Sequence, residues 1–344
     1  MKNKKFNQVK IRSLKLSDLK EYQFFISKFW KKDHIFIKNK NFFLWQHSFN
    51  KKKINCVSVF YKKKILGSQN YIDFKQFDED LSKKQIFLGL WSAPTNSNFV
   101  GLGFLIYKEI IKKEKPDFIG TIGFNSKTIN FHKWQNFKLG KMNHHAFISP
   151  YIKKFKIAKI VDKSMIHKIS SVRDVKFYET DKNTLTDLNI NKLFKYQTPL
   201  KSKKYLINRY LIHPVFKYKI FYHKEGNSIP CLFVLREVVN QNAKILKIVD
   251  FIGQNKYFYK IKYLLNKLFK KHNYEYASIY STGIPNYIFK KANFFSIDES
   301  SKNIIPNYFK PFVKKNISIN YGYKSEKMNN IRFFCADCDQ DSPN

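Results

Sequence analysis

Residues 98–104 read Asn98-Phe99-Val100-Gly101-Leu102-Gly103-Phe104. They lie between a predicted strand over residues 85–91 and a predicted amphipathic helix that begins near residue 102 and ends before Pro116. Gly101 and Gly103 allow the backbone to turn tightly and to approach a ligand closely. The N–H groups at a helix start, together with the positive end of the helix dipole, suit a pyrophosphate. The stretch therefore predicts an anion-binding bend, although the third glycine of the dinucleotide-binding signature is missing.

The elements on either side of this bend predict a mixed α/β domain. Before it, residues 54–61 and 65–72 form two predicted strands joined by a tight lysine turn. After the helix come a predicted strand over 118–124, a short helix over 126–135 and a closing strand over 145–152. Because helices and strands alternate, we expect a mixed sheet with helices on both faces.

A similar order of elements returns later in the chain. The predicted elements are a helix over residues 205–211, a hairpin of strands 217–222 and 231–237, a strand over 244–252, a helix over 257–271, a strand over 276–281 and a short helix over 285–291. Phe137 and Phe294 occupy equivalent positions at a shift of 157 residues. We therefore expect an internal duplication, with a first domain over 1–155, a linker over 156–190 and a second domain over 191–344. One larger α/β domain is the alternative.

The bend, its flanking strand and helix, and the segment from Asn125 to Phe137 resemble the GCN5-related N-acetyltransferase (GNAT) fold. The usual loop of that family is Gln/Arg-x-x-Gly-x-Gly/Ala, and Asn98 stands at its first position here. Asn125 and Phe137 match the family's later segment, Asn-x-x-Ala…Tyr…Gly-Phe. The residues that differ from it are Thr128, His132 and Asn136. The resemblance implies an α/β (α+β) protein of two GNAT-like domains, each with a mixed, mostly antiparallel sheet and helices on both faces.

The resemblance also implies a co-substrate, acetyl-coenzyme A or another acyl-coenzyme A. Its pyrophosphate would rest on residues 98–103, and its pantetheine would lie between the strands that end near Trp91 and Phe124. The residues implied in cofactor binding are Trp91, Ser92, Asn98, Phe99, Val100, Gly101, Leu102, Gly103 and Asn125. Phe258 and Lys260 replace the two glycines in the second half, so we expect the first half to bind the donor.

Two residues are candidates for the chemistry that the resemblance implies, the direct attack of an amine on a thioester. Such attack needs a base for the amine proton, a donor for the oxyanion and an acid for the leaving thiolate. His132 stands where the family often has a tyrosine acid, and histidine can donate a proton near neutral pH; a surface or packing role is the alternative. Asp250 ends a predicted strand where such folds place a base, and a capping role is its alternative.

The C-terminal end is acidic in a basic chain. If it is extended, Asp337, Asp339 and Asp341 share one face and could hold an ammonium, sugar hydroxyls or a hard cation; a frayed tail is the alternative. The segment resembles an Asp-x-Asp-Gln-Asp-Arg-Pro-Asn ending of tandem GNAT-like proteins associated with bacterial surface-polysaccharide synthesis, with Ser342 in place of the Arg. This resemblance implies an amino-sugar acceptor, which can be nucleotide-linked.

Two further residues are candidates for contacts with the acceptor. Trp45 could line the acceptor pocket, although tryptophan in such a position is often part of the core. Arg209 could clamp a carboxylate or a phosphate, or form a surface ion pair. We expect no metal site, because Cys335 and Cys338 have the spacing of half a zinc site and no second pair follows.

The formal net charge of +40 comes mostly from lysine, since only five of the 65 basic residues are arginine. We interpret it mainly as a solvated surface that attracts anions, and nucleic acid is not the expected partner. The sequence contains no long uncharged apolar run of the kind that predicts a membrane span, and we expect a cytoplasmic location. The prediction is an N-acyltransferase that acts on a small-molecule amine. The alternatives are a Fem-type aminoacyl transferase, which uses charged tRNA, and a non-catalytic basic binding protein.

Overall fold

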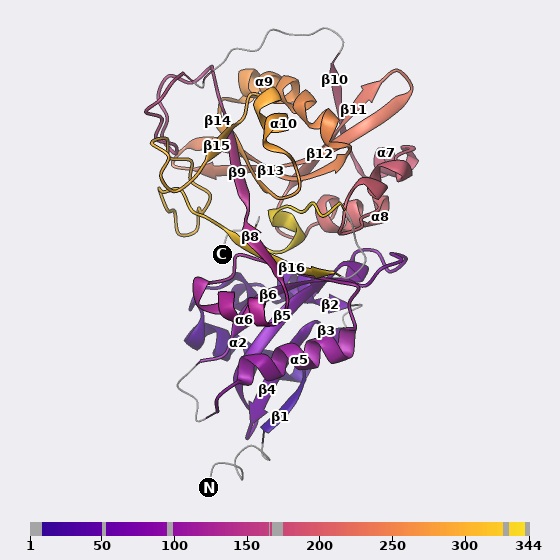
Figure 1. Ribbon diagram of the computed structural model, residues 1–344, viewed down its shortest axis with the longest axis vertical. Coiled ribbons are helices and arrows are strands. Elements are labelled where there is room, and N and C mark those ends of the chain that lie inside the picture. Colours follow the sequence, from indigo (N-terminus) through magenta and orange to yellow (C-terminus); the bar gives the residue numbers. More distant parts are fainter. Residues whose placement is uncertain are drawn as a thin grey trace. The chain divides into compact units, whose positions relative to one another are not determined.

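The computed structural model describes residues 9–49, 53–94, 99–164, 166, 175–325 and 330–340. These residues form two compact units, of which the first comprises residues 1–122 and 323–326 and the second comprises 123–322 and 327–344. Each unit contains a sheet flanked by helices (Figure 1). The mixed α/β fold expected from the sequence is therefore confirmed.

The first unit is built on a sheet in which β1, β4, β5, β6 and β7 lie side by side. All neighbouring pairs are antiparallel except β6 and β7, which are parallel. The described elements of this unit up to Ile122 are β1 (Val9–Ser13), η1 (Leu16–Asp18), α2 (Leu19–Phe29), α3 (Ile35–Lys38), α4 (Lys40–His47), β2 (Ser48–Phe49), β3 (Lys53–Ile54), β4 (Cys56–Tyr61), β5 (Lys64–Asp73), η2 (Phe74–Gln76), β6 (Gln85–Ser92), α5 (Leu102–Glu114) and β7 (Phe118–Ile122).

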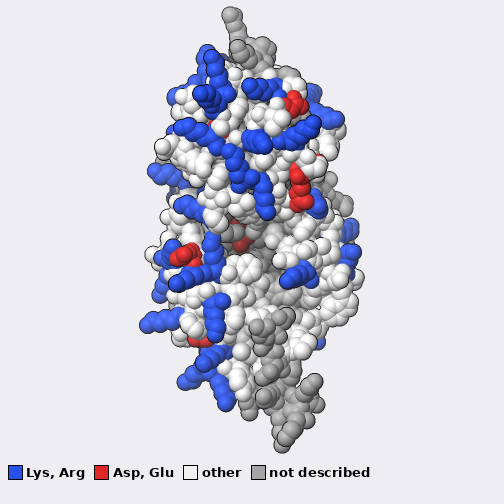
Figure 2. Space-filling model, turned by 90° about the vertical axis from the view of Figure 1, so that its left-hand side faces the viewer, with Lys and Arg blue, Asp and Glu red and all other residues white. Residues whose placement is uncertain are grey.

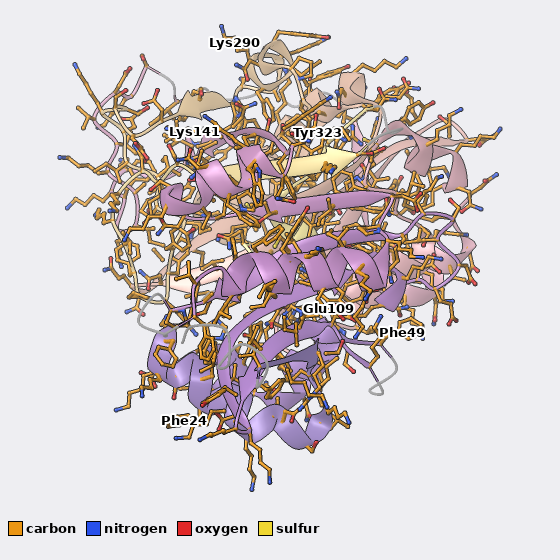
Figure 3. All side chains as sticks on the ribbon, turned by 60° about the horizontal axis from the view of Figure 1, so that its bottom comes forward. Phe24, Phe49, Glu109, Lys141, Lys290 and Tyr323 are labelled. Atoms are coloured by element: carbon orange, nitrogen blue, oxygen red, sulfur yellow. The ribbon has the colours of Figure 1, made fainter. Side chains whose placement is uncertain are left out.

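Helices cover both faces of this sheet. Successive side chains of β5 point to opposite faces, so neighbouring residues of this strand contact different helices. On one face the hydroxyl of Tyr71 donates to the buried Glu114 of α5 over 2.6 Å. On the other face the Oδ1 of Asn70 accepts from Tyr22 of α2 over 2.7 Å. Phe24, which is 60 % exposed, points outward from α2 (Figure 3).

The expected lysine turn between the first two long strands is present. Lys62 and Lys63 join β4 to β5 with φ values of 47° and 68°. Two successive left-handed residues suit the right-handed twist of a hairpin.

The second unit holds a sheet with the order β10-β11-β12-β13-β14-β9-β15. Its pairs are antiparallel except β13 and β14, which are parallel. The described strands of the second unit, whether or not they belong to this sheet, are β8 (Lys138–Lys141), β9 (Asn143–Ile148), β10 (Lys176–Thr180), β11 (Tyr218–Glu225), β12 (Ser228–Asn240), β13 (Ala243–Gly253), β14 (Tyr274–Ser281) and β15 (Phe295–Ile297), while β16 (Asn320–Ser325) begins in this unit. Its described helices are η3 (Ser126–Thr128), α6 (Ile129–Trp134), α7 (Lys182–Asp187), η4 (Asn191–Tyr196), α8 (Lys203–Leu206), the π-helical η5 (Ile207–Leu211), η6 (Asn255–Lys260), α9 (Ile261–His272), α10 (Asn286–Lys291) and η7 (Cys335–Asp337).

The strand expected to close the first half is found in this second sheet. As β9, it lies between β14 and β15 and is antiparallel to both. Its two histidines point to opposite faces, where His144 stacks on Tyr280 with ring centroids 4.0 Å apart and His145 stacks on Phe289 at 3.7 Å.

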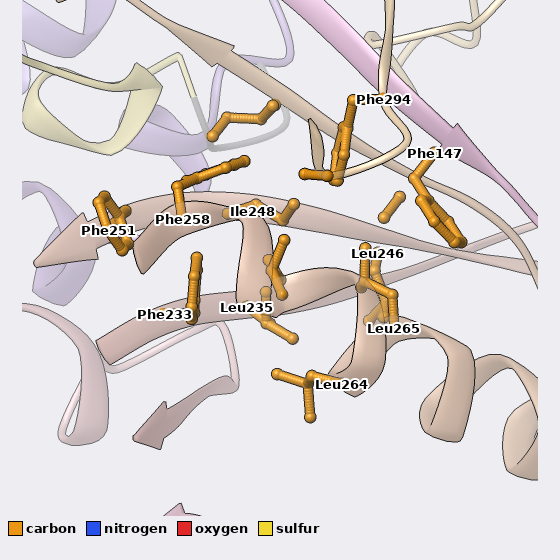
Figure 4. Packing of buried hydrophobic residues seen from close by; sticks show 14 of the residues in the cluster. Phe147, Phe233, Leu235, Leu246, Ile248, Phe251, Phe258, Leu264, Leu265 and Phe294 are labelled. Atoms are coloured by element: carbon orange, nitrogen blue, oxygen red, sulfur yellow. The ribbon is translucent and has the colours of Figure 1, made fainter. Parts of the chain in front are cut away.

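The core of the second unit is rich in phenylalanine. Figure 4 shows Phe233 of β12, Phe251 of β13 and Phe258 of η6 packed together with Leu264 and Leu265 of α9. These side chains lie between the sheet and α9, and each is no more than 3 % exposed. The amphipathic pattern that predicted the helix over 257–271 thus identifies the face that is buried.

Two segments contain short elements whose bounds the sequence analysis did not give. The range 156–190 contains β10 and the short helix α7, whose first turn is capped by Asp181 through a 2.8 Å bond from the Thr184 N–H. Residues 35–47 form α3 and α4, each begun by a side-chain cap from His34 or Asn39. Both segments form short, capped helices, for which periodicity over a window of 11 or more residues is a weak signal.

Candidate functional site

A one-residue bulge interrupts β6 before the strand ends. Tyr71 of β5 pairs with Leu88, whereas Gln69 pairs with Trp91, so β6 contains one residue more than its partner. The parallel pairing of β6 with β7 ends at Leu88 and Thr121, although β6 continues to Ser92. A bulge bends its strand and terminates pairing. The last four residues of β6 therefore extend beyond the ladder with β7.

Gly101 begins helix α5 in a backbone conformation that other residues rarely adopt. Its φ is +82°, and among the described residues a β-carbon built there would meet nothing within 4 Å. The glycine is therefore required by its left-handed conformation rather than by crowding. The open space beside it lies at the helix start, where N–H groups of the first turn lack partners within the helix.

Gly103 has a different role from Gly101. A β-carbon there would lie 2.5 Å from Cζ2 of Trp91, so the helix packs its backbone directly on the indole of β6. Together the two glycines bring the exposed start of α5 next to the bulged end of β6. The strand, the glycine-containing bend and the helix follow one another in the order that the sequence predicted; anion binding at the bend stays a prediction.

The rest of the bend is anchored on one side and exposed on the other. Phe99 is buried, with its ring centroid 5.6 Å from that of Tyr61, and Leu102 is 3 % exposed. Val100 is 90 % exposed. Ser92 is buried and pairs with Ser68 of β5. Asn98 lies outside the described residues.

His132 lies in an aromatic cluster of the second unit. The imidazole is 1 % exposed, and the centroids of Phe124 and Phe137 lie 4.5 and 5.1 Å from it. Burial lowers the pKa of His132 from 6.5 to about 4, so the ring is neutral at pH 7. Asn125 caps the first turn of η3, where its Oδ1 accepts from the Lys127 N–H over 2.9 Å. The catalytic role of His132 stays a prediction.

Trp45 belongs to an aromatic group in the first unit. Its ring is stacked on Phe42 at 5.9 Å and tilted against Phe77 at 5.2 Å. The environment is that of a partly buried packing residue, and a contact with an acceptor stays a prediction.

The bulge of β6 has a counterpart in the second sheet. Val234 of β12 pairs with Asp250, whereas Leu235 pairs with Ile248, so β13 contains one additional residue. The described parallel pairing of β13 with β14 runs to Lys247 and Ser278, although β13 continues to Gly253. Both units thus have a parallel strand pair that is joined through a helix and follows three antiparallel pairs.

A C-terminal segment lies between the diverging ends of β13 and β14. On one side, Phe334 bridges to Ser281 of β14. On the other, the guanidinium of Arg332 donates to the carbonyl of Gly253 over 2.8 Å. Gly283 permits this approach, since a β-carbon there would lie 2.0 Å from the carbonyl oxygen of Ile331. This part of the second sheet is therefore occupied by the chain itself.

Three of the residues singled out in the sequence, Arg209, Asp250 and Asp337, lie close together here. Lys201, which is fully buried, lies 2.7 Å from Oδ2 of Asp250 and 2.6 Å from Oδ1 of Asp337. The hydroxyl of Tyr210 donates to the same Oδ2 over 2.7 Å. Arg209 donates to the backbone carbonyls of residues 336 and 338 over 2.8 and 3.1 Å. The group fixes the C-terminal segment through buried charged contacts.

Burial sets the protonation of this group. It raises the pKa of Asp337 to about 6, with the nearby Asp250 carboxylate acting in the same direction and Lys201 opposing both. It also lowers the pKa of Arg332 to about 10. Sequence reasoning missed Lys201, Tyr210 and Arg332 as members of the group. One lysine among many carries no sequence signal that it will be buried.

The described part of the acidic end, residues 337–340, is not extended. Residues 335–337 form η7, in which Oδ2 of Asp337 accepts from the Phe334 N–H over 2.8 Å. Asp339 is partly buried and accepts from Gln340 over 2.9 Å. Asp341 lies outside the described residues. A substrate contact of these carboxylates stays a prediction.

Positive charge is spread over the face of the molecule that Figure 2 shows. Figure 2 shows Lys and Arg spread over the visible face with few Asp and Glu between them. In the part of the chain that the structure describes, no helix is long and apolar enough to span a bilayer.

Solved structures with the same fold include GNAT proteins. A GCN5-related N-acetyltransferase from Anabaena variabilis superposes with a TM-score of 0.57 at 6 % identity, over 92 % of this chain and 72 % of that one. A protein from Pyrococcus horikoshii, provisionally assigned as an acetyltransferase, gives a TM-score of 0.55 at 11 % identity over 96 % and 94 % of the two chains. N-myristoyltransferase from Saccharomyces cerevisiae, solved with myristoyl-CoA, gives 0.51 at 10 % identity over 93 % and 79 %. No protein-family model and no curated protein matches the sequence. The chain therefore has a GNAT-like fold.

Proposed function

We propose that the protein is an N-acyltransferase that takes its acyl group from an acyl-coenzyme A. The observation that carries this proposal is the combination of the bulged, overhanging end of β6 with the exposed helix start at Gly101. The first offers backbone groups beyond the β6–β7 ladder, and the second offers N–H groups to an anion. The similar proteins named as acetyltransferases and N-myristoyltransferase support the same class of reaction.

The residues of the first unit fit the two ends of such a donor. The start of α5 would hold the pyrophosphate, because the space beside Gly101 is open and Val100 is exposed. Backbone groups of residues 89–92 would hydrogen-bond the extended pantetheine arm as a neighbouring strand would. The bound thioester supplies the activated acyl group. Trp91 supports the helix start from beneath through its contact with Gly103.

We further propose that the chain is an internal duplication with one donor site. The two sheets share the order of antiparallel and parallel pairs and the position of the bulge. In the second half, the C-terminal segment contacts both β14, through Phe334, and the end of β13, through Arg332. Phe258 and Lys260 also replace the two glycines there. The sequence repeats would be 1–155 and 191–344, joined by 156–190.

The acceptor is proposed to be a primary amine on a small molecule. The resemblance of the acidic C-terminal end to tandem proteins of surface-polysaccharide synthesis favours an amino sugar. His132, Asp250, Arg209 and Asp337 keep their proposed catalytic and acceptor roles, although each is buried. Their burial makes them equally suited to positioning other groups, and substitution separates the two roles.

Acyl transfer can be measured directly with the full chain. The protein is incubated with acetyl-coenzyme A and a panel of amines that includes free and nucleotide-linked amino sugars, and the released thiol and the mass of the product are followed. We expect amine-dependent thiol release with a mass gain of one acetyl group. A wild-type protein that binds no acetyl-coenzyme A would contradict the proposal. Steep salt dependence with binding to charged tRNA would instead favour the Fem-type alternative.

A further inference from the structure

A second candidate binding site lies wholly within the second unit. A cavity of about 360 Å³ is lined by residues 215–216, residues 236–240 of β12, Lys247 of β13 and residues 307–310. Small-molecule sites typically occupy roughly 300–1,000 Å³. None of these residues belongs to the proposed donor site.

Two buried cations face each other across the strand pair that lines this cavity. Arg236 of β12 and Lys247 of β13 are direct cross-strand partners. They are 7 % and 8 % exposed. Like charges placed directly opposite each other destabilise an antiparallel pair, and exclusion of water strengthens their repulsion. An anion bound between them would relieve this repulsion.

Aromatic rings hold both cations at the wall. The guanidinium of Arg236 lies 4.0 Å from the ring centroid of Phe216, and the Nζ of Lys247 lies 5.4 Å from that of Phe309. Such contacts orient a cation, and the ammonium of Lys247 also donates to the backbone carbonyl of Asn307 over 2.9 Å. The rings also leave an apolar surface beside the charges, to which Tyr308 contributes.

The wall offers further donors to an anion. Asn307 is 4 % exposed, and among the described residues its Nδ2 has no hydrogen-bond partner. Lys310 adds a third cation. Glu237 is the one carboxylate of the described lining, and it is engaged by the Tyr274 hydroxyl at 2.6 Å and by Lys244 at 3.7 Å. The lining therefore carries an excess of positive charge and an unused amide donor.

We propose that this cavity binds a small phosphate ester. Arg236 and Lys247 would contact the phosphate, with the fork of the arginine suited to two of its oxygens. The amide of Asn307 would donate to a third oxygen, and the organic part would pack against Phe309 and Tyr308. The proposal does not depend on the acyltransferase function, because the two sites share no residue.

Thermal unfolding of the full chain tests the proposal at constant ionic strength. The probes are adenosine 5′-monophosphate, glucose 6-phosphate and inorganic phosphate, each compared with chloride. We expect at least one ester to raise the melting temperature of the wild type by several degrees at millimolar concentration, because a ligand that binds only the native state stabilises it. A larger effect of the nucleotide than of the sugar ester would identify a planar organic part.

Two matched variants separate this site from general surface charge. Lys247→Met and Lys224→Met remove one positive charge each from the same sheet, but only Lys247 lines the cavity. We expect the ester to lose its effect on Lys247→Met and to keep it on Lys224→Met. Equal stabilisation of both variants, or no stabilisation of the wild type by any probe, would overturn the proposal.

A conservative substitution covers the case in which Lys247→Met does not fold. Arg236→Lys keeps the charge but removes the planar fork, so the ester should bind about tenfold more weakly in calorimetric titration. An unchanged affinity of Arg236→Lys for the ester would also overturn the proposal.

Discussion

The indole of Trp91 and the backbone of Gly103 are in direct contact, since a β-carbon at Gly103 would lie 2.5 Å from Cζ2 of the ring. The contact joins the bulged end of β6 to the first turn of α5. It therefore fixes where the first turn of the helix lies relative to the end of the strand. The proposed donor site depends on the distance between the first turn of α5 and the end of β6.

The Trp91–Gly103 contact predicts that Gly103→Ala is destabilising. The added methyl group overpacks the contact, and such changes cost about 1–3 kcal/mol of unfolding free energy. A second substitution, Trp91→Leu, should remove most of this penalty in the double variant, because the ring is no longer there. Urea denaturation of the four proteins measures the coupling. Additive effects of the two substitutions would show that the residues do not contact each other.

The buried ion pairs of the second unit predict a large effect of Lys201→Met. The substitution leaves the carboxylates of Asp250 and Asp337 buried without their shared cation. Breaking a buried pair in this way costs about 3–5 kcal/mol. Adding Asp250→Asn and Asp337→Asn should recover part of the loss in the melting temperature. An unaltered melting temperature of Lys201→Met would contradict the buried arrangement.

The fit of the C-terminal segment against β14 is tested at Gly283. Gly283→Ala combines a positive φ of 82° with a β-carbon 2.0 Å from the carbonyl oxygen of Ile331. Gly226→Ala is the matched control, because its φ is 57° and a β-carbon there meets nothing within 4 Å. We expect limited proteolysis to cut residues 330–340 faster in Gly283→Ala than in the control. Equal cleavage rates would contradict the placement of the segment.

The buried histidines predict loss of stability in mild acid. Burial lowers the pKa of His132 and His145 to about 4 and that of His144 to about 3, against 6.5 in the unfolded chain. Between these values the unfolded state binds more protons, so stability is fully present above pH 6.5 and falls as the pH drops toward 4. For His132 the lowering corresponds to roughly 3 kcal/mol. Asp337, whose pKa is raised, opposes this trend between about pH 4 and 6.

Urea midpoints at pH 7.5 and pH 5 measure this dependence. His145→Gln should reduce the difference between the two midpoints, and His272→Gln, which replaces a partly exposed histidine at the end of α9, is the control. The same pH dependence in all three proteins would show that His145 does not contribute.

Much of the first sheet and of the bend was predictable from the sequence. The periodic apolar pattern of β4, β5, β6 and α5 identifies each element, and Gly101 and Gly103 mark the bend because few other residues tolerate its geometry. The location of β9 in the second sheet was not predictable, since strand pairing between distant segments leaves no local signal. The same holds for Lys201, whose burial depends on carboxylates 49 and 136 positions away.

One titration tests most directly whether the bend at Gly101 binds the donor. Acetyl-coenzyme A is added to the wild type, to Gly101→Asp and to the isosteric Gly101→Asn, and the melting temperature is followed. Asparagine tolerates the left-handed conformation, so both variants should fold. We predict that the wild type is stabilised by several degrees, that Gly101→Asn retains part of this shift, and that Gly101→Asp loses it through charge repulsion. An unshifted wild type at millimolar ligand, or equal shifts in Gly101→Asp and the wild type, would contradict the donor site.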